Sequence, residues 1–453
     1  MNILKKALIA VAVLGLAACD SDSNDAIALP AATVDTFSLQ VLHASPDAPP
    51  VDILVNGNTV ASGAEFKVGT AQSDLPVAGP YTIEVQGILA GGATASVIGP
   101  VDITFDADTI YTIVAVDTVA NIAPLIFEQP RTPVSTGNAR VAVLHGAPSA
   151  PQVDIFVTAP AASLAGMMPT ATLAFGDAPA GPLEVPADDY QIRITAAGDA
   201  TAVVYDSGTI PLGDGDDLFI AAVDNTGPGT SPVSLVALNG GGSLEIADAA
   251  TPAVARIYHA SPDAPTVDIV VNDNFAAPLV NDLAFGDPAA VASVPADTYN
   301  IKVSALDGAV IAIDADLTLD AGEAYDVLAI DNLASIRPLV LNDDPREVAL
   351  YAKVRIIHGS PSAGNVDIYV TAPGTDINNA EPTLVDVPFE ANTGYLALDA
   401  GDYEVTVTAT GSKMAAIGPA PLNLAGGDVL SITAIDAAGG GTPLNILLNN
   451  DAL

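Results

Sequence analysis

The sequence has few of the residues on which several protein functions depend. Tryptophan is absent and aromatic residues make up only 5% of the 453 residues, so the stacking platforms of carbohydrate-binding sites are scarce. The chain has 13 Lys and Arg against 54 Asp and Glu, which gives a formal net charge of −41. A surface of this charge repels phosphate backbones, which argues strongly against nucleic acid as a partner.

Cysteine occurs once, at Cys19, so the chain cannot form an internal disulfide. Its stability must therefore come from packed cores, for which units of about a hundred residues are long enough. The single cysteine lies near the N-terminus, at the end of the sequence Leu16-Ala17-Ala18-Cys19. This sequence resembles the bacterial lipobox, in which a signal peptidase cleaves before the cysteine and the thiol carries diacylglycerol.

Residues 1–18 have the features of a lipoprotein signal peptide. Lys5 and Lys6 precede the apolar run Ala7–Leu16, which is too short for a convincing membrane span. We therefore predict that Cys19 is the mature N-terminus and the lipid attachment site. More than one acyl chain on one cysteine gives the stable anchoring that a single chain does not.

Residues 19–36 are polar and acidic, then rich in small residues, and show no sustained period, so they are expected to form an acidic tether. The lipidated N-terminus makes the membrane a predicted partner. We expect the protein to be lipid-anchored and extracytoplasmic in the cell envelope, on the outer membrane or on the periplasmic face of the inner membrane. Asp20, directly after the cysteine, does not decide which of the two membranes carries the anchor.

All four histidines lie in one repeated motif. We therefore interpret the motif as part of a repeated domain before considering catalysis. The first and third copies share His-Ala-Ser-Pro-Asp-Ala-Pro, whereas the second and fourth have His-Gly and then Pro-Ser-Ala, which indicates duplication of a tandem pair. The four copies are "LHASPDAPPVDILV" from Leu42, "LHGAPSAPQVDIFV" from Leu144, "YHASPDAPTVDIVV" from Tyr258 and "IHGSPSAGNVDIYV" from Ile357.

Other landmarks recur in the same order and indicate strands. Tyr81–Val85 alternates apolar and polar residues, which is the period of a half-buried strand, and it has counterparts in every repeat. Runs such as "YTIVAVD", which ends at Asp117, are apolar on both faces, as expected of central strands. Asn56-Gly57 and Asn272-Asp273 favour tight hairpins.

Seven or eight strands per repeat, separated by turn signals, are typical of a β-sandwich. We predict an all-β fold of four tandem antiparallel β-sandwich domains, immunoglobulin-like or transthyretin-like, and leave open whether they form compact pairs or a rod. The predicted repeats span residues 37–130, 138–240, 253–344 and 352–453.

The histidine of each repeat is expected to be structural. The residues two and four positions before His43 are apolar, so the histidine shares their face and should be buried, neutral and hydrogen-bonded. We hypothesise that Asp52, in the Val-Asp-Ile that follows, pairs with the corner's backbone or with the histidine. Its counterparts in the other repeats are Asp154, Asp268 and Asp367.

The catalytic alternative to a structural histidine is a hydrolase that uses Ser45, His43 and Asp52. It fails on internal comparison, because the second repeat has Ala147 in place of Ser45. A structural zinc site is disfavoured because it usually needs four ligands and each repeat offers one imidazole. Calcium is more plausible, since Asp214–Asp217 and Asp314–Glu323 are acidic, although neither segment has EF-hand spacing.

At this point the motifs resemble a known family. "VLHASPDAPPVDILVNGN", "AGPYTIEV" and "YTIVAVD" look like the bacterial domain-of-unknown-function family 4397, which occurs in secreted and surface proteins. The resemblance extends from Thr36 to the C-terminus. It implies an extracytoplasmic β-domain and supplies no catalytic residues.

Together these observations predict a non-catalytic binding, adhesion or structural module of the cell envelope, and not an enzyme. No catalytic, cofactor-binding or metal site is predicted, and no small-molecule substrate is evident. The expected partner, besides the membrane, is an unidentified protein or envelope component. The alternative is a calcium-dependent envelope binding protein, and the least favoured interpretation is a hydrolase.

Overall fold

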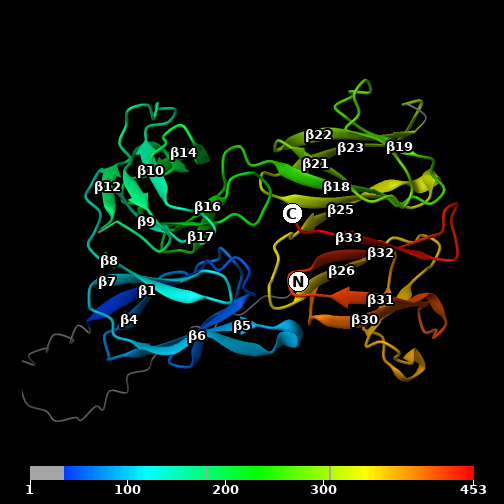
Figure 1. Cartoon of the computed structure of the whole chain (residues 1–453), viewed down its shortest axis with the longest axis horizontal. Helices are drawn as coiled ribbons and strands as arrows, with labels where there is room; N and C mark the ends of the chain where they lie inside the picture. Colours follow the sequence, from blue (N-terminus) through cyan, green and yellow to red (C-terminus); the bar gives the residue numbers. More distant parts are fainter. Residues whose placement is uncertain (1–34, 180, 306–307) are drawn as a thin grey trace, which may run out of the picture. The chain divides into compact units, whose positions relative to one another are not determined.

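Strands dominate the structure of the protein, a computed structural model that describes residues 35–179, 181–305 and 308–453 (Figure 1). In these ranges the helices are short 3-10 turns: η1 (Ala90–Gly92), η2 (Leu333–Ser335) and η3 (Ile377–Asn379). None of the helices in the described part of the chain is long and apolar enough to cross a membrane. The predicted all-β fold is confirmed.

Each repeat is a sandwich of two sheets. We call one the histidine sheet, because one of its strands ends in the repeat's histidine, and the other the aspartate sheet, because one of its strands begins with Val-Asp-Ile. In the first repeat the histidine sheet has the order β4 (Ser73–Pro76), β1 (Thr36–His43), β7 (Thr109–Val116) and β8 (Ala123–Pro130). Its aspartate sheet has the order β3 (Asn58–Ala64), β2 (Val51–Val55), β5 (Tyr81–Ile88) and β6 (Thr94–Ile103).

The second repeat keeps this plan and extends its histidine sheet by one strand. The histidine sheet has the order β12 (Leu183–Pro186), β9 (Asn138–His145), β15 (Asp217–Asp224), β16 (Val233–Leu238) and β17 (Ser243–Ile246). The aspartate sheet has the order β11 (Ala171–Leu173), β10 (Val153–Thr158), β13 (Asp188–Ala196) and β14 (Val203–Leu212).

The third and fourth repeats also have one sheet of each kind. The third has the histidine sheet β21 (Ala290–Val294), β18 (Ala253–His259), β24 (Ala324–Ile330), β25 (Arg337–Asp343) and the aspartate sheet β20 (Val280–Leu283), β19 (Val267–Val271), β22 (Asp297–Ala305), β23 (Val310–Leu319). The fourth has the histidine sheet β29 (Asn392–Leu398), β26 (Ala352–His358), β32 (Val429–Ile435), β33 (Asn445–Asn450) and the aspartate sheet β28 (Leu384–Val387), β27 (Val366–Thr371), β30 (Gly401–Ala409), β31 (Ala415–Leu424).

Neighbouring strands are antiparallel except at one place in each histidine sheet. There the strand that ends in the histidine runs parallel to the central strand: β1 with β7, β9 with β15, β18 with β24 and β26 with β32. The chain visits the aspartate sheet between these two strands. It also adds the edge strand of the histidine sheet on the way, so the two parallel strands are joined by a long connection and not by a two-residue hairpin.

The core of each sandwich follows from the alternation of side chains along its strands. In β2, Val51, Ile53 and Val55 are buried, while Asp52 and Leu54 between them are half-buried on the other face. The first sandwich is filled by aromatic rings. Phe37 of the histidine sheet stacks on Phe105 with ring centroids 4.4 Å apart.

The outer face of the histidine sheet explains why the central strands are apolar on both sides. In β7, Ile113 and Ala115 face the sandwich core, and Val114 and Val116 face the histidine sheet of the second repeat. One buried cluster joins the two sheets, formed by Leu42, Ala44, Phe66, Val114, Val116, Ala142, Leu144, Phe219, Ala221, Val223, Val236 and Leu238. The first and second repeats therefore form a pair through their histidine sheets.

The third and fourth repeats also meet through their histidine sheets. Their shared apolar cluster is smaller and consists of Tyr258, Ala260, Leu328, Ile330, Ile435 and Leu447. The remainder of this contact is polar and is described below. The sequence leaves open whether the repeats form compact pairs or a rod, and in the structure neighbouring repeats form pairs.

The two predicted hairpins have different outcomes. Asn56 and Gly57 have φ of 51° and 74° and join β2 directly to β3, as predicted. Asn272 and Asp273 also have positive φ, but β20 begins only at Val280, so the prediction of a tight hairpin there is wrong. Pro278 lies in the intervening segment and has no N–H group for a strand ladder.

Burial of Phe219 between the first two repeats gives a test of their pairing. Its ring lies 5.1 Å from that of Phe127 and is 1% exposed. Phe219→Ala should destabilise the first pair by about 3–5 kcal/mol, because it removes a buried ring and leaves a cavity. Differential scanning calorimetry should show the two repeats unfolding at a lower temperature.

The matched control is Phe275→Ala, because Phe275 is 39% exposed in a loop of the third repeat and its removal should cost much less. An equal effect of the two substitutions would contradict the pairing.

Candidate functional site

Both nitrogens of each repeated histidine are used inside the chain. In the first repeat the Nδ1 atom of His43 accepts the backbone N–H of Ser45 at 3.3 Å, and its Nε2 lies 3.1 Å from the carbonyl oxygen of Pro49. An amide can only donate and a carbonyl can only accept, so the proton is on Nε2 and the ring is neutral. The same two contacts recur at His145, His259 and His358.

Burial reinforces the neutral state of these rings. His43 is 1% exposed, and the loss of hydration on burial lowers its pKa to about 4. Burial likewise lowers the pKa values of His259 and His358. The expectation of buried, neutral, hydrogen-bonded histidines is confirmed.

A phenylalanine lies edge-on to each histidine, a contact that the sequence analysis missed. In the first repeat the ring centroids of His43 and Phe66 are 6.3 Å apart. The other three partners are Phe175, Phe285 and Phe389, with centroid distances of 6.5, 6.1 and 6.1 Å. One phenylalanine recurs about twenty to thirty residues after each histidine, which is the signal that could have found them.

The hypothesis that the Val-Asp-Ile aspartate binds the corner or the histidine is wrong. Asp52 instead accepts hydrogen bonds from the Ser62 hydroxyl at 2.7 Å and the Gly63 amide at 2.9 Å, both on β3. Its neighbours Val51 and Ile53 face the core, so alternation places Asp52 on the opposite face of the sheet from the histidine. The aspartate therefore stabilises the pairing of β2 with β3.

The aspartates of the other repeats have the same role in their own sheets. Asp154 binds Thr172 and Gly198, Asp268 binds the amide of Asp282, and Asp367 binds the amides of Asp386 and Gly411.

The candidate triad of Ser45, His43 and Asp52 is not assembled. Ser45 offers His43 its backbone amide and not its hydroxyl, and the hydroxyl has no hydrogen-bond partner in the described structure. Asp52 lies on the outer face of the aspartate sheet. A serine nucleophile needs its hydroxyl within reach of the histidine, and the third group must orient that histidine.

The two acidic segments considered for calcium are also occupied by contacts within the chain. In Asp214–Asp217, Asp214 accepts the amide of Gly137, Asp216 accepts the amide of Gly213, and Asp217 pairs with Arg140. In Asp314–Glu323, Asp314 pairs with Lys302 at 3.5 Å. The carboxylates therefore act as turn caps and ion-pair partners.

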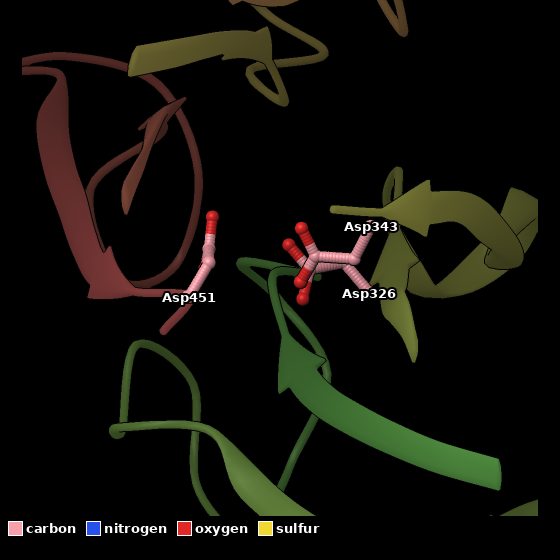
Figure 2. A group of neighbouring side chains, drawn as sticks. All are labelled: Asp326, Asp343 and Asp451. Atoms are coloured by element: carbon pink, nitrogen blue, oxygen red, sulfur yellow. The ribbon is translucent and has the colours of Figure 1, made fainter. Parts of the chain in front are cut away.

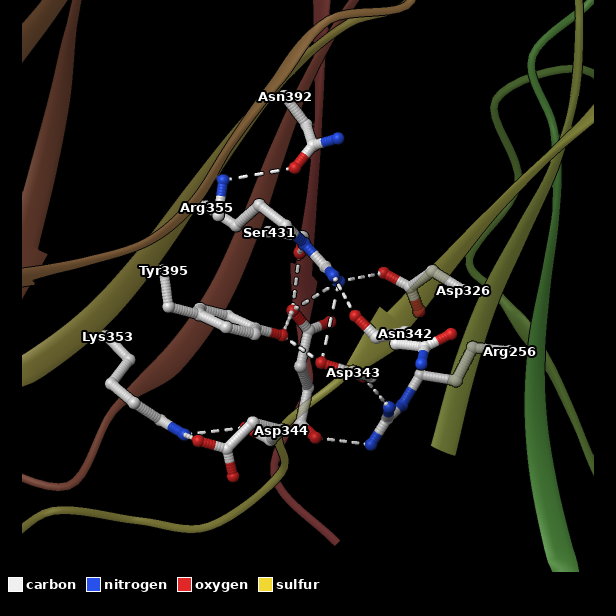
Figure 3. Close-up of polar contacts among 12 residues, drawn as sticks. Arg256, Asp326, Asn342, Asp343, Asp344, Lys353, Arg355, Asn392, Tyr395 and Ser431 are labelled. Carbon is white, nitrogen blue, oxygen red and sulfur yellow. Dashed lines mark hydrogen bonds and ion pairs between the residues drawn. The ribbon is translucent and has the colours of Figure 1, made fainter. Parts of the chain in front are cut away.

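A buried ionic cluster lies between the histidine sheets of the third and fourth repeats (Figure 3). Its acidic members are Asp326 and Asp343 from the third repeat and Asp451 from the end of the chain, and one oxygen of each lies within 4.8 Å of the others (Figure 2). Its cations are Arg256 of β18 and Arg355 of β26. We call these five residues the ionic cluster.

Arg355 holds the centre of the ionic cluster. Its Nη2 lies 2.5 Å from Asp326 and 3.5 Å from both Asp343 and Asp451. Its Nε donates to the Ser431 hydroxyl at 2.9 Å, and its guanidinium lies 4.7 Å from the centre of the Tyr395 ring. The side chain is 2% exposed, so these contacts form in an environment that strengthens ion pairs.

The remaining members connect the two repeats directly. Arg256 of the third repeat pairs with Asp343 and also donates to the backbone carbonyl oxygen of Asp451 in the fourth. Tyr395 of the fourth repeat donates to Asp343 of the third and lies 2.8 Å from Asp451. The fourth repeat thus supplies donors to carboxylates of the third, and Arg256 of the third repeat donates to a backbone carbonyl of the fourth.

The three carboxylates could serve as metal ligands, but their arrangement favours ion pairs with the two arginines over a bound metal. A divalent cation prefers several oxygen ligands and here would share them with two guanidinium groups. The charges of Arg256 and Arg355 already meet the carboxylates, and a further cation would be repelled at these distances.

Burial raises the pKa of two carboxyl groups of the cluster. Burial, and next the charge of Asp451, raise the pKa of Asp326 to about 7, although Arg355 opposes the shift. Burial and the charge of Asp343 also raise the pKa of Asp451. Three carboxylates face two guanidiniums, so a proton on one of them brings the cluster to neutrality.

The first pair has no such cluster at the corresponding positions. Arg256 pairs in register with Asp326, and Arg355 with Ser431, whereas the equivalent pairs are Gln40 with Thr112 and Ala142 with Phe219. Arg256 in "ARIYH" and Asp326 in "YDVLAID" are charged residues within apolar runs, which is a signal in the sequence that each needs a buried partner but not which one.

Fold and geometry together define the class of this protein as a tandem β-sandwich repeat protein. A family model described as "Domain of unknown function (DUF4397)" matches residues 37–156, 253–369 and 352–453. The chain therefore belongs to the DUF4397 family, and the predicted resemblance is confirmed. Cys19, the predicted lipid attachment site, lies outside the described residues.

The chain is similar, at low identity, to several solved structures, of which two are described. The Bacillus anthracis TIE protein is 13% identical over 88% of this chain and 68% of its own, with a TM-score of 0.15. The product complex of the multi-modular glycogen-degrading pneumococcal virulence factor SpuA is 11% identical over 74% of this chain and 44% of its own, with a TM-score of 0.15. Scores this low carry no functional argument. No curated protein matches the sequence.

Replacing His43 tests the structural role of the histidine. His43→Ala should destabilise the first repeat by about 2–4 kcal/mol at pH 7.5, because the Pro49 carbonyl and the Ser45 amide lose their buried partners. The lowered pKa of His43 makes its contribution complete above pH 6.5 and lost as the pH falls towards 4. Calorimetry of wild type and variant across this range should show their difference shrinking in acid.

The control for His43 is Thr59→Ala on the exposed face of β3, which should leave the transition unchanged. A variant as stable as wild type at pH 7.5 would refute the structural role.

Replacing Asp326 tests the charge balance of the ionic cluster. Its raised pKa means that its favourable contribution is complete below pH 3.8 and is lost as the pH rises through about 7. Asp326→Asn resembles the protonated carboxyl, so it should gain stability over wild type as the pH rises from 4 to 8. Unfolding by denaturant at a series of pH values measures the difference.

The contrasting variant is Arg355→Met, which leaves buried carboxylates unpaired and should cost about 3–5 kcal/mol. The account fails if the difference between Asp326→Asn and wild type does not change with pH.

Proposed function

We propose that this protein is a lipid-anchored, extracytoplasmic protein of the cell envelope that acts as a non-catalytic binding, adhesion or structural module. One observation carries the non-catalytic part. The motif that defines the repeats uses its histidines and aspartates to hold strands and corners together. A motif whose histidine and aspartate side chains hold strands and corners in this way supports a scaffold better than a repeated active site.

The tandem arrangement fits a scaffold for a second reason. Neighbouring repeats bury the outer faces of their histidine sheets against each other, and apolar and ionic contacts both contribute. Such contacts give a rigid pair whose remaining loops and aspartate sheets are available to partners. Binding residues usually occur in such loops.

The anchoring part of the proposal depends on Cys19. The lipobox-like sequence Leu16–Cys19 and the polar tether of residues 19–36 support an acylated N-terminus that holds the sandwiches at a distance from the bilayer. The net charge of −41 keeps such a protein soluble beside a membrane. The same charge disfavours nucleic acid, so we propose a protein or another envelope component as the partner.

The proposal includes no metal cofactor. The acidic segments that made calcium the alternative use their carboxylates on amides, on Arg140 and on Lys302. In the corners, the backbone carbonyl and amide beside each histidine are likewise hydrogen-bonded to its ring nitrogens. The stability of the chain should accordingly be independent of calcium once salt has screened its diffuse charge.

Replacing Cys19 tests the anchor. In bacteria expressing the full chain, wild type should sediment with membranes and incorporate labelled palmitate. Cys19→Ser should lose the label and leave the membrane fraction, because no thiol remains to carry diacylglycerol. Ser21→Ala is the matched control and should behave as wild type.

Membrane fractionation and autoradiography give the two readouts. If Cys19→Ser stays with the membranes and wild type carries no label, the proposed anchor is wrong.

A further inference from the structure

The core of the third sandwich is divided by a cavity. One buried cluster contains Ile257, Ile269 and Ile313, a second contains Ala253, Leu319 and Tyr325, and an apolar cavity of about 110 Å³ is lined by residues of both clusters. In the other sandwiches the buried residues of the core form one continuous cluster in the described structure.

Two alanines on β18 leave space at the positions that large residues fill in the first sandwich. Measured from the histidine, Ala253 and Ala255 occupy the places of Phe37 and Leu39. All four side chains are buried on the core-facing side of their strands. The first sandwich thus contains a ring and a branched chain where the third has two methyl groups.

A third replacement enlarges the difference. Phe105, which stacks on Phe37 in the first sandwich, corresponds to Leu319. The correspondence rests on the tyrosine that follows: the hydroxyl of Tyr111 accepts the amide of Asp106, and that of Tyr325 accepts the amide of Asp320. Leu319 and Ala255 line the cavity, which therefore occupies part of the space that Phe105 and Leu39 fill in the first sandwich.

The walls of this cavity select for an apolar ligand. They consist of aliphatic side chains from both sheets, the ring of Tyr299 and Asp316. The Tyr299 hydroxyl donates to the carbonyl oxygen of Pro295, and the carboxylate of Asp316, an exposed residue, accepts the side-chain amide of Asn300 at 3.1 Å. Leu279 is among the lining residues and is 41% exposed, so the cavity reaches the surface near β20, an edge strand.

We propose that the third sandwich binds an uncharged hydrocarbon group between its two sheets, either a compact ring or the end of an aliphatic chain. Apolar cavities of this size stay dry and take up benzene or xenon, as an engineered cavity of about 150 Å³ does. The ligand regains the dispersion contacts that the lining residues lack. The first sandwich, filled by its own aromatic rings, does not bind.

The second sandwich also contains an apolar cavity, of about 160 Å³. The test must therefore report on each sandwich separately.

The test is a titration of the full chain with benzene, followed by methyl NMR. The chain carries Cys19→Ser so that no acyl chain competes for the cavity. Benzene should shift the methyl signals of Ile269 and Ile313 in a saturable way, while those of Ile53 and Ile83 in the first sandwich stay unchanged. A parallel titration with n-hexane distinguishes a preference for a ring from a preference for an aliphatic chain.

The decisive variant fills the cavity with the residues of the first sandwich. Ala255→Leu combined with Leu319→Phe should weaken benzene binding at the third sandwich at least tenfold and should not lower the unfolding temperature, because both residues line the cavity and the added groups pack in existing space. Leu319→Phe provides a second, smaller filling if the double variant does not fold, and it should also weaken binding.

The proposal is overturned if the methyl signals of the third sandwich do not respond to benzene or hexane. It is also overturned if the filled variants fold and bind as tightly as wild type.

Discussion

Burial of the central strand of each histidine sheet on both of its faces is the constraint on which this structure depends. Val114 and Ile113 are adjacent in β7, and both are almost completely buried, one towards the second repeat and the other towards the sandwich core. A strand that is apolar on both faces cannot leave one face in water. Each sandwich therefore needs a neighbour, and the repeats come in pairs.

The two pairs meet this constraint by different physical means. In the first, aromatic and aliphatic side chains such as Phe219 and Leu144 fill the space between the sheets. In the second, Arg355 stands where the first pair has Ala142, and Asp326 stands where it has Thr112. Burial of these charges is offset only because each finds a partner. An apolar contact tolerates many arrangements, whereas a buried ionic cluster is satisfied in very few. The contact within the second pair also depends on pH through Asp326.

The protein uses its histidines and several of its few arginines at buried positions where they bind other polar groups. A chain with few cations places two of its arginines, Arg256 and Arg355, in one buried cluster. Its four histidines lie at four equivalent corners, one in each repeat. In each corner a ring nitrogen satisfies a carbonyl that the proline-rich turn leaves without a partner. These uses explain why a recurring histidine and aspartate need not indicate catalysis.

Local alternation was enough to predict the sandwich fold, the burial of His43 and the hairpin at Asn56-Gly57. It also placed Asp52 on the face opposite to the core, but the hypothesis for this residue ignored that consequence and chose a partner on the wrong face. The ionic cluster was out of reach for a different reason. Asp326 and Asp451 are far apart in the sequence, and only the packing of two sheets brings them together.

The same limit applies to the cavity of the third sandwich. The alanines of β18 are visible in the sequence, but whether neighbouring side chains collapse into the space is decided by the whole core. The sequence predicts elements and faces well because these depend on near neighbours. It predicts contacts between repeats poorly, since those depend on how complete sheets meet.

Hydrogen exchange of the full chain, followed by mass spectrometry, tests the central claim most directly. If the histidine sheets are packed against each other in pairs, the amides of β7, β15, β24 and β32 should be the slowest to exchange, because their strands are central and covered on both faces. The amides of β5, β13, β22 and β30, which are central in the aspartate sheets, should exchange measurably faster. Equal exchange of the two sets would contradict the pairing of repeats.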